Sequence, residues 1–352
     1  MLTEIRVAYF GTGAFAQKHH LPELSKWGNV EVAYAVSPSP VSREEFARIH
    51  YEAKGTTPQQ FDSLDTFLSS NPNFDAAVIA TPVDSHFALA STLLDRGKPL
   101  YIEKPFMPSP SEALEIADKA DHFGIPVVIG ANRCVFPAYR TAASALKSGL
   151  IGDVTRLLFY YEHSWDKLTK DSVWRQDPNH PGSGLVRDHF AHYGHYLVNL
   201  GFHPEKAKHS NTTYNENGVD VSTTFCLYDT SNKTAAFLLN GSSTGKDRQE
   251  EISLYGTKGM ITIKFEGKAS QAYLEFYEQP ETRMDNASAL SELRALGISD
   301  YTSHPALLHN FLHIVQGDLV ENASPARDGV LVASMTEAIL RARAEERSIT
   351  LV

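Results

Sequence analysis

One carboxylate and two imidazoles stand close together in the middle of the chain. Asp188, His192 and His195 are spaced i, i+4 and i+7 in the segment Gly182 to His195, so a helix there would carry all three on one face. Histidine gains and loses a proton readily near neutral pH, and a carboxylate one turn away can orient it. The spacing favours proton transfer. A hydrogen-bonded polar helix face and a metal site remain alternatives, and His189 is expected to be structural.

A lysine follows a short apolar run in the first half of the chain. Lys104 stands in Glu103-Lys104-Pro105, directly after the run Leu100 to Ile102. If that run is a parallel strand, the lysine lies at its carboxyl end, where open α/β sheets bind their ligands. A cationic donor there can stabilise charge that develops on a substrate oxygen. Taken alone, the position suits a solvated surface lysine better, and only the other motifs favour chemistry.

A glycine-rich loop near the amino terminus has the context of a dinucleotide fingerprint. It follows the apolar run Ile5 to Phe10 and opens a helix at Gln17. The first glycine permits the tight turn, the second lets the backbone approach a pyrophosphate, and the small residue at its end lets the helix pack closely. The predicted cofactor-binding residues of this loop are Gly11, Thr12, Gly13, Phe15 and Ala16. Because this loop already supplies a redox cofactor, we predict no metal site.

The end of the second predicted strand bears on the choice of cofactor. An acidic residue there usually binds the ribose hydroxyls of NAD, but the chain reads Ser37-Pro38-Ser39-Pro40. No carboxylate stands there to repel a 2′-phosphate, and Arg43 could neutralise one. We therefore expect NAD or NADP with a slight preference for NADP, and Ser37 as a cofactor contact.

The hydrophobic period changes along the chain and predicts two domains. The first part alternates short apolar runs with helical patterns, which indicates βαβ units, so residues 1–128 are predicted to form a Rossmann NAD(P)-binding domain. Residues 129–352 show longer alternating segments and are predicted to form an α+β domain with a large open, mainly antiparallel sheet. The strands expected in this second part are Thr155 to Glu162, Val221 to Tyr228, Thr234 to Leu239, Glu251 to Tyr255 and Met260 to Phe265.

Composition limits the class of partner. The chain has 352 residues and a formal net charge of −10, so the basic surface that nucleic-acid binding needs is not expected. Its two cysteines, Cys134 and Cys226, have no metal-ligand spacing. Neither a signal peptide nor a run of about twenty apolar residues is recognisable. We expect a cytoplasmic protein with a small-molecule substrate and no nucleic-acid or membrane partner.

Taken together, the motifs resemble the Gfo/Idh/MocA family of oxidoreductases, named after glucose-fructose oxidoreductase, inositol dehydrogenase and a rhizopine catabolism protein. The resemblance spans nearly the whole chain. Its strength lies in the order and spacing of segments that are individually weak. Besides the loop and Glu103-Lys104-Pro105, these are Ala80-Thr81-Pro82 with His86, Asn132-Arg133 before Phe136-Pro137, Trp174-Arg175, the Asp188/His192 helix, Gly256-Thr257-Lys258-Gly259 and Asp328-Gly329.

The resemblance implies roles for particular residues. Lys104 would contact both the cofactor and a substrate hydroxyl, His192 would be the acid and base, and Asp188 would support it. Thr81, Pro82, His86 and Glu103 would line the nicotinamide side of the cofactor. The substrate would be a sugar, sugar derivative or cyclitol, and the second domain would form a homodimer or homotetramer through its sheet. Candidate substrate contacts are Asn132, Arg133, Tyr161, Trp174, Arg175 and His195.

Two departures from the family pattern leave the substrate open. His195 stands where the family often has an aspartate, and Phe190 replaces a glycine. Two other functions also remain open: an NAD-retaining glycosidase of the same fold, and a non-catalytic dinucleotide-binding regulator. Lys104 and His192 argue against the regulator, because a sensor needs no proton transfer.

Overall fold

The computed structural model describes residues 4–231, 233–243, 248–266, 269–277, 282–298 and 305–351. The chain divides into two compact units. The first comprises Met1–Asn132 and Ala295–Val330, and the second comprises Arg133–Arg294 and Leu331–Val352. The chain first passes from one unit to the other a few residues after the expected boundary at 128/129. Unlike the expectation, the segment from Ala295 to Val330 returns to the first unit.

The first unit contains a parallel sheet with the strand order β3-β2-β1-β4-β5-β6. This order is that of a dinucleotide-binding Rossmann fold, in which the ligand lies beyond the carboxyl ends of the strands where the order reverses. The reversal falls between β1 and β4. The strands are β1 (Ile5–Phe10), β2 (Val30–Val36), β3 (Gln59–Phe61), β4 (Ala76–Ile79), β5 (Leu100–Ile102) and β6 (Val127–Ile129).

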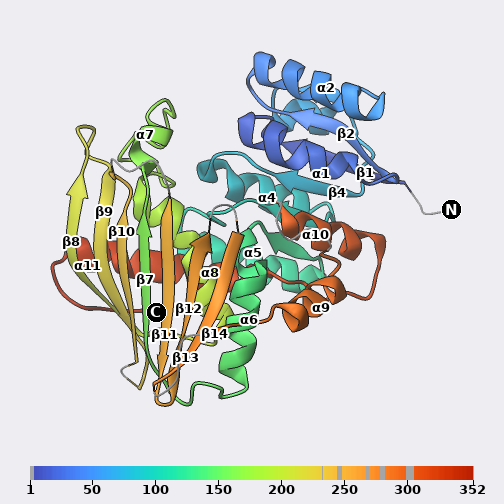
Figure 1. Cartoon of the computed structure of the whole chain (residues 1–352). Helices are drawn as coiled ribbons and strands as arrows, with labels where there is room; N and C mark the ends of the chain where they lie inside the picture. The colour runs from blue at the N-terminus through green and yellow to red at the C-terminus, as the bar shows by residue number, and fades with distance from the viewer. Residues whose placement is uncertain are drawn as a thin grey trace. The chain divides into compact units, whose positions relative to one another are not determined.

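Helices connect and cover these strands, as Figure 1 shows for α1, α2 and α4. Their starts follow from local sequence. Ser109 caps α5 by accepting from the backbone of Glu112, and Pro110 occupies the first turn, where its missing N–H costs nothing. The helices and helical turns of this unit are η1 (Ala16–His20), α1 (Leu21–Ser25), α2 (Pro40–Lys54), α3 (Leu64–Ser69), η2 (Val83–Ser85), α4 (His86–Leu94), α5 (Pro110–Phe123) and α10 (Ala306–Gln316). Two further elements, η3 (Asn132–Val135) and α9 (Ala287–Ala295), have one residue each in this unit and otherwise belong to the second unit.

The second unit contains a mainly antiparallel sheet with the order β14-β13-β12-β11-β7-β10-β9-β8-β15, in which β7 and β10 pair in parallel. The open antiparallel sheet predicted from the sequence is confirmed. The strands are β7 (Val154–Glu162), β8 (Lys206–Tyr214), β9 (Asp220–Tyr228), β10 (Thr234–Asn240), β11 (Gln249–Gly256), β12 (Gly259–Glu266), β13 (Ala269–Phe276), β14 (Thr282–Arg283) and β15 (Ile349–Thr350).

Helices pack on one face of this sheet, which Figure 1 shows for α6, α8 and α11. Inward residues of the strands, such as Phe159 and Phe237, form the core with Tyr193 of α8 and Met335 of α11. Outward residues of the central strands include Leu158 and Leu238, which are 38% and 44% exposed. The helices of this unit are α6 (Pro137–Lys147), α7 (Trp165–Thr169), η4 (Val186–Phe190), α8 (Ala191–Asn199) and α11 (Ala326–Ala344), which begins in the first unit.

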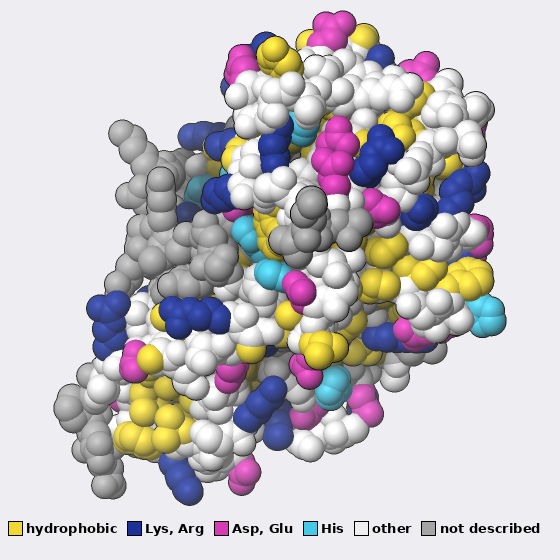
Figure 2. All heavy atoms as spheres, turned by 90° about the vertical axis from the view of Figure 1, so that its right-hand side faces the viewer, with side chains coloured by type: hydrophobic (Ala, Val, Ile, Leu, Met, Phe, Trp, Pro, Cys, Tyr) yellow, Lys and Arg dark blue, Asp and Glu magenta, His cyan; other side chains and the backbone are white. Residues whose placement is uncertain are grey.

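Charge is well mixed over the face of the molecule in Figure 2. Lysine and arginine side chains lie among aspartate and glutamate side chains there, so neither sign dominates this view. Among the described residues, none of the helices is long and apolar enough to cross a membrane.

Candidate active site

The glycine-rich loop turns at the switch point of the first sheet. Gly11 has a positive φ of 93°, and a Cβ there would lie 2.5 Å from the carbonyl oxygen of Ala80, so a larger residue would collide with the end of β4. Around Gly13, in contrast, a Cβ would meet nothing within 4 Å. The two glycines therefore serve different needs: one lets the chain turn against β4, and the other leaves open space beside the backbone for a ligand.

The loop is fixed by side chains of the following helices. The hydroxyl of buried Thr12 lies 2.8 Å from that of Ser42, and the amide of Gln17 donates to the carbonyl of Thr12 at 2.8 Å. Phe15 is exposed and Ala16 is buried at the start of η1. This bracing means that a ligand would meet a loop whose shape is already set.

Ser37 and Arg43 lie together beyond the end of β2. Arg43 donates from Nη1 to the carbonyl of Ser37, and Ser42 lies 3.4 Å from the Ser37 hydroxyl. Among the described residues, the buried Nε of Arg43 has no hydrogen-bond partner. This corner therefore presents hydroxyls and a guanidinium, with a donor still to be satisfied.

Glu103 is the best-anchored residue of the Glu103-Lys104-Pro105 turn. Its carboxylate accepts from His20 Nε2 at 3.1 Å, Tyr101 Oη at 3.1 Å and the Lys104 backbone at 3.2 Å. Burial raises the pKa of Glu103, but the hydrogen bond and charge of His20, with Lys104 and Tyr101, outweigh burial and leave the pKa below its ordinary value. Glu103 is thus held as a carboxylate, and Lys104 leaves the end of β5 from a fixed backbone through a cis bond to Pro105.

The support behind Glu103 was not predicted from the sequence. His20 is fully buried, and because the carboxylate can only accept, His20 donates from Nε2 and its Nδ1 faces the hydroxyl of Tyr9. Tyr101 could have been predicted as a partner of Glu103, because it stands two residues earlier and residues two apart in an extended segment point to the same side. Gly130 makes room for this group, since a Cβ there would lie 2.7 Å from Glu103 Oε1.

His86 connects two loops at the same edge of the first sheet. Its Nε2 lies 2.9 Å from the carbonyl of Thr81 and its Nδ1 lies 3.1 Å from the carbonyl of Phe106. Burial lowers its pKa, so the ring is neutral and carries a single proton for the two acceptors. His86 is 1% exposed, whereas Thr81 and Pro82 remain accessible. A direct contact of these three residues with a cofactor stays a prediction.

In the second unit, the predicted Asp188/His192 segment is helical and begins with a turn of π-helix, η4, that continues into α8. Gly184, with φ of 86°, approaches Asp220 so closely that a Cβ would lie 2.1 Å from Oδ1. Asp220 Oδ2 then accepts from the backbone of Val186 at 2.9 Å and satisfies a donor at the start of the helix. Single π-turns are often found at functional sites.

Asp188 is held by an aromatic donor and a cation. Its Oδ2 accepts from Trp165 Nε1 at 2.9 Å and lies 3.5 Å from Nε of Arg175. The Arg175 guanidinium stacks 4.0 Å from the ring centroid of Trp174, which lies next to His180. The predicted site residues Asp188, Trp174 and Arg175 are therefore brought together, and Trp165 is a member that the sequence analysis missed.

A buried cluster of charge lies beside His189, the residue that follows Asp188. Arg133 donates from Nη1 to both oxygens of Glu250 at 3.0 and 2.9 Å, and Nη2 lies 3.4 Å from Nε2 of His189. Tyr139 and Arg248 also donate to Glu250. Burial raises the pKa of Glu250, but the two arginines outweigh burial and leave it below its ordinary value. The guanidinium of Arg133 is thus engaged in an ion pair with Glu250 inside the second unit, and its contact with a substrate stays a prediction.

The two remaining histidines of the helix differ from one another. His192 is 8% exposed, and its ring centroid lies 5.9 Å from that of His189, whose ring packs 3.9 Å from Tyr161. His195 is 1% exposed, and burial lowers its pKa from 6.5 to about 4. His195 therefore offers almost no surface to a ligand in this structure, and Tyr161, also 1% exposed, offers little more.

Asn132, the last of the predicted substrate contacts, forms hydrogen bonds within the first unit. It belongs to the first unit, where its side chain accepts from the backbone of Leu307 at 2.9 Å and donates to Gly130 at 3.1 Å. It thereby satisfies a donor in the first turn of α10. Across the described residues, no group of three or more histidine, cysteine, aspartate or glutamate side chains is arranged to hold a metal ion.

Comparison with known proteins agrees with this geometry. Residues 5–131 match the model of an oxidoreductase family with an NAD-binding Rossmann fold, and residues 139–262 match the Gfo/Idh/MocA C-terminal domain. The first unit is thus an NAD-binding Rossmann domain of the oxidoreductase type. The chain belongs to the Gfo/Idh/MocA family.

Relatives of known sequence or structure are distant. An uncharacterized oxidoreductase of Schizosaccharomyces pombe is 30% identical over 54% of this chain and 50% of its own length. Inositol 2-dehydrogenase 1 of Saccharopolyspora erythraea is 30% identical over 42% of this chain and 43% of its own length. The chain spans about half the length of such curated relatives. The structure of levoglucosan dehydrogenase in complex with NADH has a TM-score of 0.82 at 19% identity, covers 99% of this chain and 100% of its own, and shows the shared fold.

Proposed function

We propose that the chain is an NAD(P)-dependent dehydrogenase or reductase that acts on a CH–OH or keto carbon of a sugar, sugar derivative or cyclitol. One observation carries the proposal: Lys104 leaves the carboxyl end of β5 from a backbone fixed by Glu103, at the sheet edge where the glycine-rich loop turns. Membership of an oxidoreductase family supports the reaction class. The similarity to an inositol dehydrogenase and a levoglucosan dehydrogenase supports the substrate class.

The described residues of the first unit fit a dinucleotide. The open space beside Gly13 suits close approach of a pyrophosphate, and η1 and α1 follow the loop directly. Thr81, Pro82 and Lys104 would lie on the nicotinamide side of this site. When bound, the nicotinamide supplies the acceptor or donor of the hydride.

The side chains of the protein would handle the proton and the developing charge. In the oxidative direction, His192 takes the proton of the substrate hydroxyl, and Lys104 donates a hydrogen bond to the same oxygen and stabilises its negative charge. Asp188, held by Trp165 and Arg175, keeps a negative charge beside the segment that carries His192 and favours its protonated form. In reduction, His192 returns the proton.

The test is a time course of NAD(P)H absorbance with purified protein, each cofactor, and a panel of sugars, cyclitols and their keto forms. Turnover is expected with at least one member. Lys104→Met and His192→Asn should then lower kcat by at least about a hundredfold while cofactor affinity persists. Lys206→Met and His203→Asn, at exposed positions, are matched controls that should behave like the unaltered protein.

Near-normal turnover in Lys104→Met or His192→Asn would contradict the assignment. Retained cofactor without net NAD(P)H production would favour the glycosidase, and binding without turnover the regulator.

We further propose that NADP is preferred and that the protein forms a homodimer or homotetramer through the sheet of the second unit. Ser37 and Arg43 support the first point, because Arg43 places a cation beside Ser37 at the end of β2, where a 2′-phosphate would lie. The second point is supported by Leu158 and Leu238, which are exposed on neighbouring strands of the face that the helices leave uncovered.

A further inference from the structure

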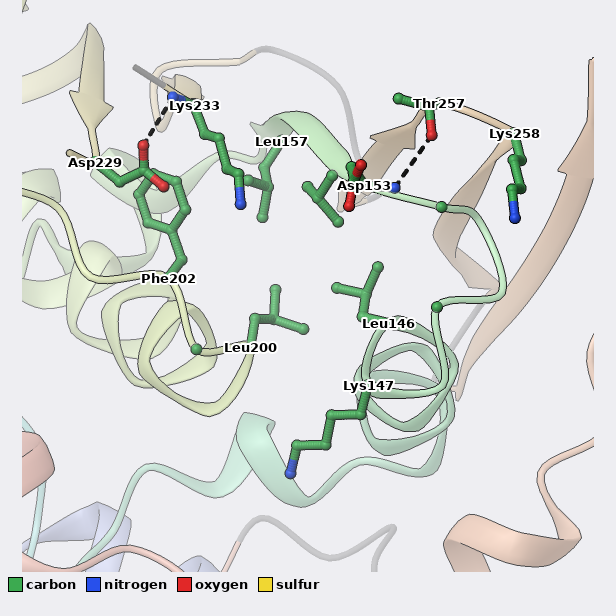
Figure 3. A pocket seen from close by; sticks show the side chains of 14 residues that line it. Leu146, Lys147, Asp153, Leu157, Leu200, Phe202, Asp229, Lys233, Thr257 and Lys258 are labelled. Carbon is green, nitrogen blue, oxygen red and sulfur yellow. Dashed lines mark hydrogen bonds between the residues drawn. The ribbon is translucent and has the colours of Figure 1, made fainter. Parts of the chain in front are cut away.

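A pocket of about 540 Å³ opens in the second unit. It lies between the carboxyl-terminal ends of α6 and α8, and its other walls come from the start of β7 and the turns after β9 and β11 (Figure 3). Pockets of this volume are typical of small-molecule sites. None of the residues assigned above to cofactor or substrate lines it.

The pocket has an apolar floor. Leu157 and Phe202 are 1% and 6% exposed, and Leu146 and Leu200 are half-buried. Figure 3 shows Leu146 and Leu200 pointing into the pocket opposite Leu157. The half-buried side chains of Leu146 and Leu200 offer the accessible apolar surface here, which favours a ligand with an apolar body because binding removes that surface from water.

Three lysines surround this floor. Lys147 comes from the last turn of α6, Lys233 from the residue before β10, and Lys258 from the turn between β11 and β12. In Figure 3 the side chain of Lys233 reaches into the pocket beside Leu157, and the other two lie at its edge. Within the described part of the chain, none of these lysines forms an ion pair. The three ammonium groups are thus available to a ligand.

Two aspartates line the same pocket, but their negative charges do not fully offset the positive charges of the three lysines. Asp229 accepts hydrogen bonds from the backbone N–H groups of Ser231 and Lys233, both at 2.8 Å, so its carboxylate is engaged by its own turn. Asp153 is exposed at the side where its backbone donates to Thr257 at 3.1 Å. The lining therefore carries one net positive charge, in a chain whose formal net charge is −10.

We propose that this pocket binds a small organic anion that joins a carboxylate to an apolar body. Lys233 would pair with the anionic group, Lys258 would add to the local potential, and the apolar floor would take the body. The site is distinct from the proposed catalytic residues. At ~1.5 Å per residue, Leu200 lies roughly 12 Å along the α8 axis from His192.

Fluorine NMR of 4-(trifluoromethyl)benzoate with the full-length protein, in the presence of saturating NADP⁺, tests the proposal. We expect broadening and a shift of the probe signal on binding. Lys233→Gln should weaken the apparent affinity by about tenfold, and Lys258→Glu, in an exposed turn, should weaken it as well. Lys208→Gln, on exposed β8, is the matched control that should leave the affinity unchanged.

Two comparison compounds separate the contributions of charge and apolar surface. The neutral 4-(trifluoromethyl)benzyl alcohol should bind more weakly than the benzoate, and acetate, which lacks the apolar body, should compete only weakly. Equal binding of the alcohol, equal effects of Lys233→Gln and Lys208→Gln, or no binding of the benzoate at millimolar concentration would each overturn the proposal.

Discussion

The carboxylate of Asp188 accepts a hydrogen bond of 2.9 Å from the indole nitrogen of Trp165, and both side chains are buried. Arg175 lies 3.5 Å from the same carboxylate oxygen. A buried carboxylate is costly unless its oxygens are satisfied, so the indole and the guanidinium fix both its orientation and its charge. The carboxylate that stands four residues before His192 is therefore held by a residue of α7, outside the helix that carries the histidine.

The substitution Trp165→Phe tests this dependence. It removes the indole donor while keeping an aromatic ring, so Asp188 loses the hydrogen bond from Trp165. We expect kcat to fall by about tenfold, with a smaller change in KM, because the support of His192 matters most as the proton moves. Steady-state kinetics measure both constants. Trp27→Phe, which alters an indole of the first unit, should leave kcat unchanged; an unchanged kcat in Trp165→Phe would show that the indole does not matter.

The Arg133–Glu250 pair gives a prediction about stability. Glu250→Gln removes the charge that Arg133 and Arg248 share, and leaves buried Arg133 without its counter-ion. Breaking such a pair from one side costs about 3 kcal/mol of the free energy of unfolding. Denaturant unfolding followed by circular dichroism measures this loss. Glu251→Gln is the matched control, because Glu251 is the next residue of β11 and is exposed; a loss of similar size there would contradict the argument.

Much of the fold could be predicted because it depends on local patterns. The buried strands β4 and β5 are continuous apolar runs, and β1 is interrupted only by Arg6. Gly256 and Gly259 bracket a two-residue turn between β11 and β12. Strand β8, which lies between β9 and the short strand β15, was missed because its polar residues lack an alternating pattern. The return of residues 295–330 to the first unit was missed for another reason. It rests on contacts between distant segments, such as Asn322 with Val127, which no local pattern encodes.

The candidate site could be predicted only in part, for a similar reason. Motif spacing identified Lys104, Asp188 and His192, since these residues lie within short continuous segments. Their partners come from elsewhere: His20 reaches Glu103 across 83 positions, and Glu250 reaches Arg133 across 117. Such pairs come together only when the chain folds, so their contacts cannot be predicted from the spacing of residues in the sequence.

The proposed preference for NADP depends on Arg43. Arg43→Gln removes the cation beside Ser37, so the KM for NADP should rise by about tenfold while the KM for NAD changes little. Ser37→Asp should act in the same direction by placing a carboxylate where the 2′-phosphate would lie. Initial rates with each cofactor measure the ratio of kcat/KM. Arg48→Gln, on an exposed position of α2, is the matched control; equal effects of Arg43→Gln on both cofactors would refute the preference.

The uncovered face of the second sheet gives a prediction about assembly. Leu238 pairs with Tyr160 on the neighbouring strand and is exposed at the centre of this face. Leu238→Asp should reduce the dimer or tetramer to monomers, because an interface loses apolar contact and gains a buried charge. Sedimentation velocity measures the change. Leu168→Asp, on exposed α7, is the control; a monomeric unaltered protein would contradict the proposal directly.

The buried ring of His195 makes the stability of the second unit depend on pH. In the folded chain its pKa is about 4, whereas the ordinary value is 6.5. Between these values the unfolded chain binds more protons than the folded chain, so the free energy of unfolding falls as the pH is lowered from 6.5 to about 4. The difference corresponds to about 3 kcal/mol.

Replacement of His195 by leucine isolates this contribution. Within the described residues, Nδ1 of His195 has no hydrogen-bond partner, so an apolar side chain of similar volume loses little there. Denaturant unfolding at pH 7 and at pH 4.5 should show a much smaller acid-side loss in His195→Leu than in the unaltered protein. His203→Gln, at an exposed position, should retain the full loss. If His195→Leu keeps the same pH dependence, other buried groups, with His86 the first candidate, are responsible for it.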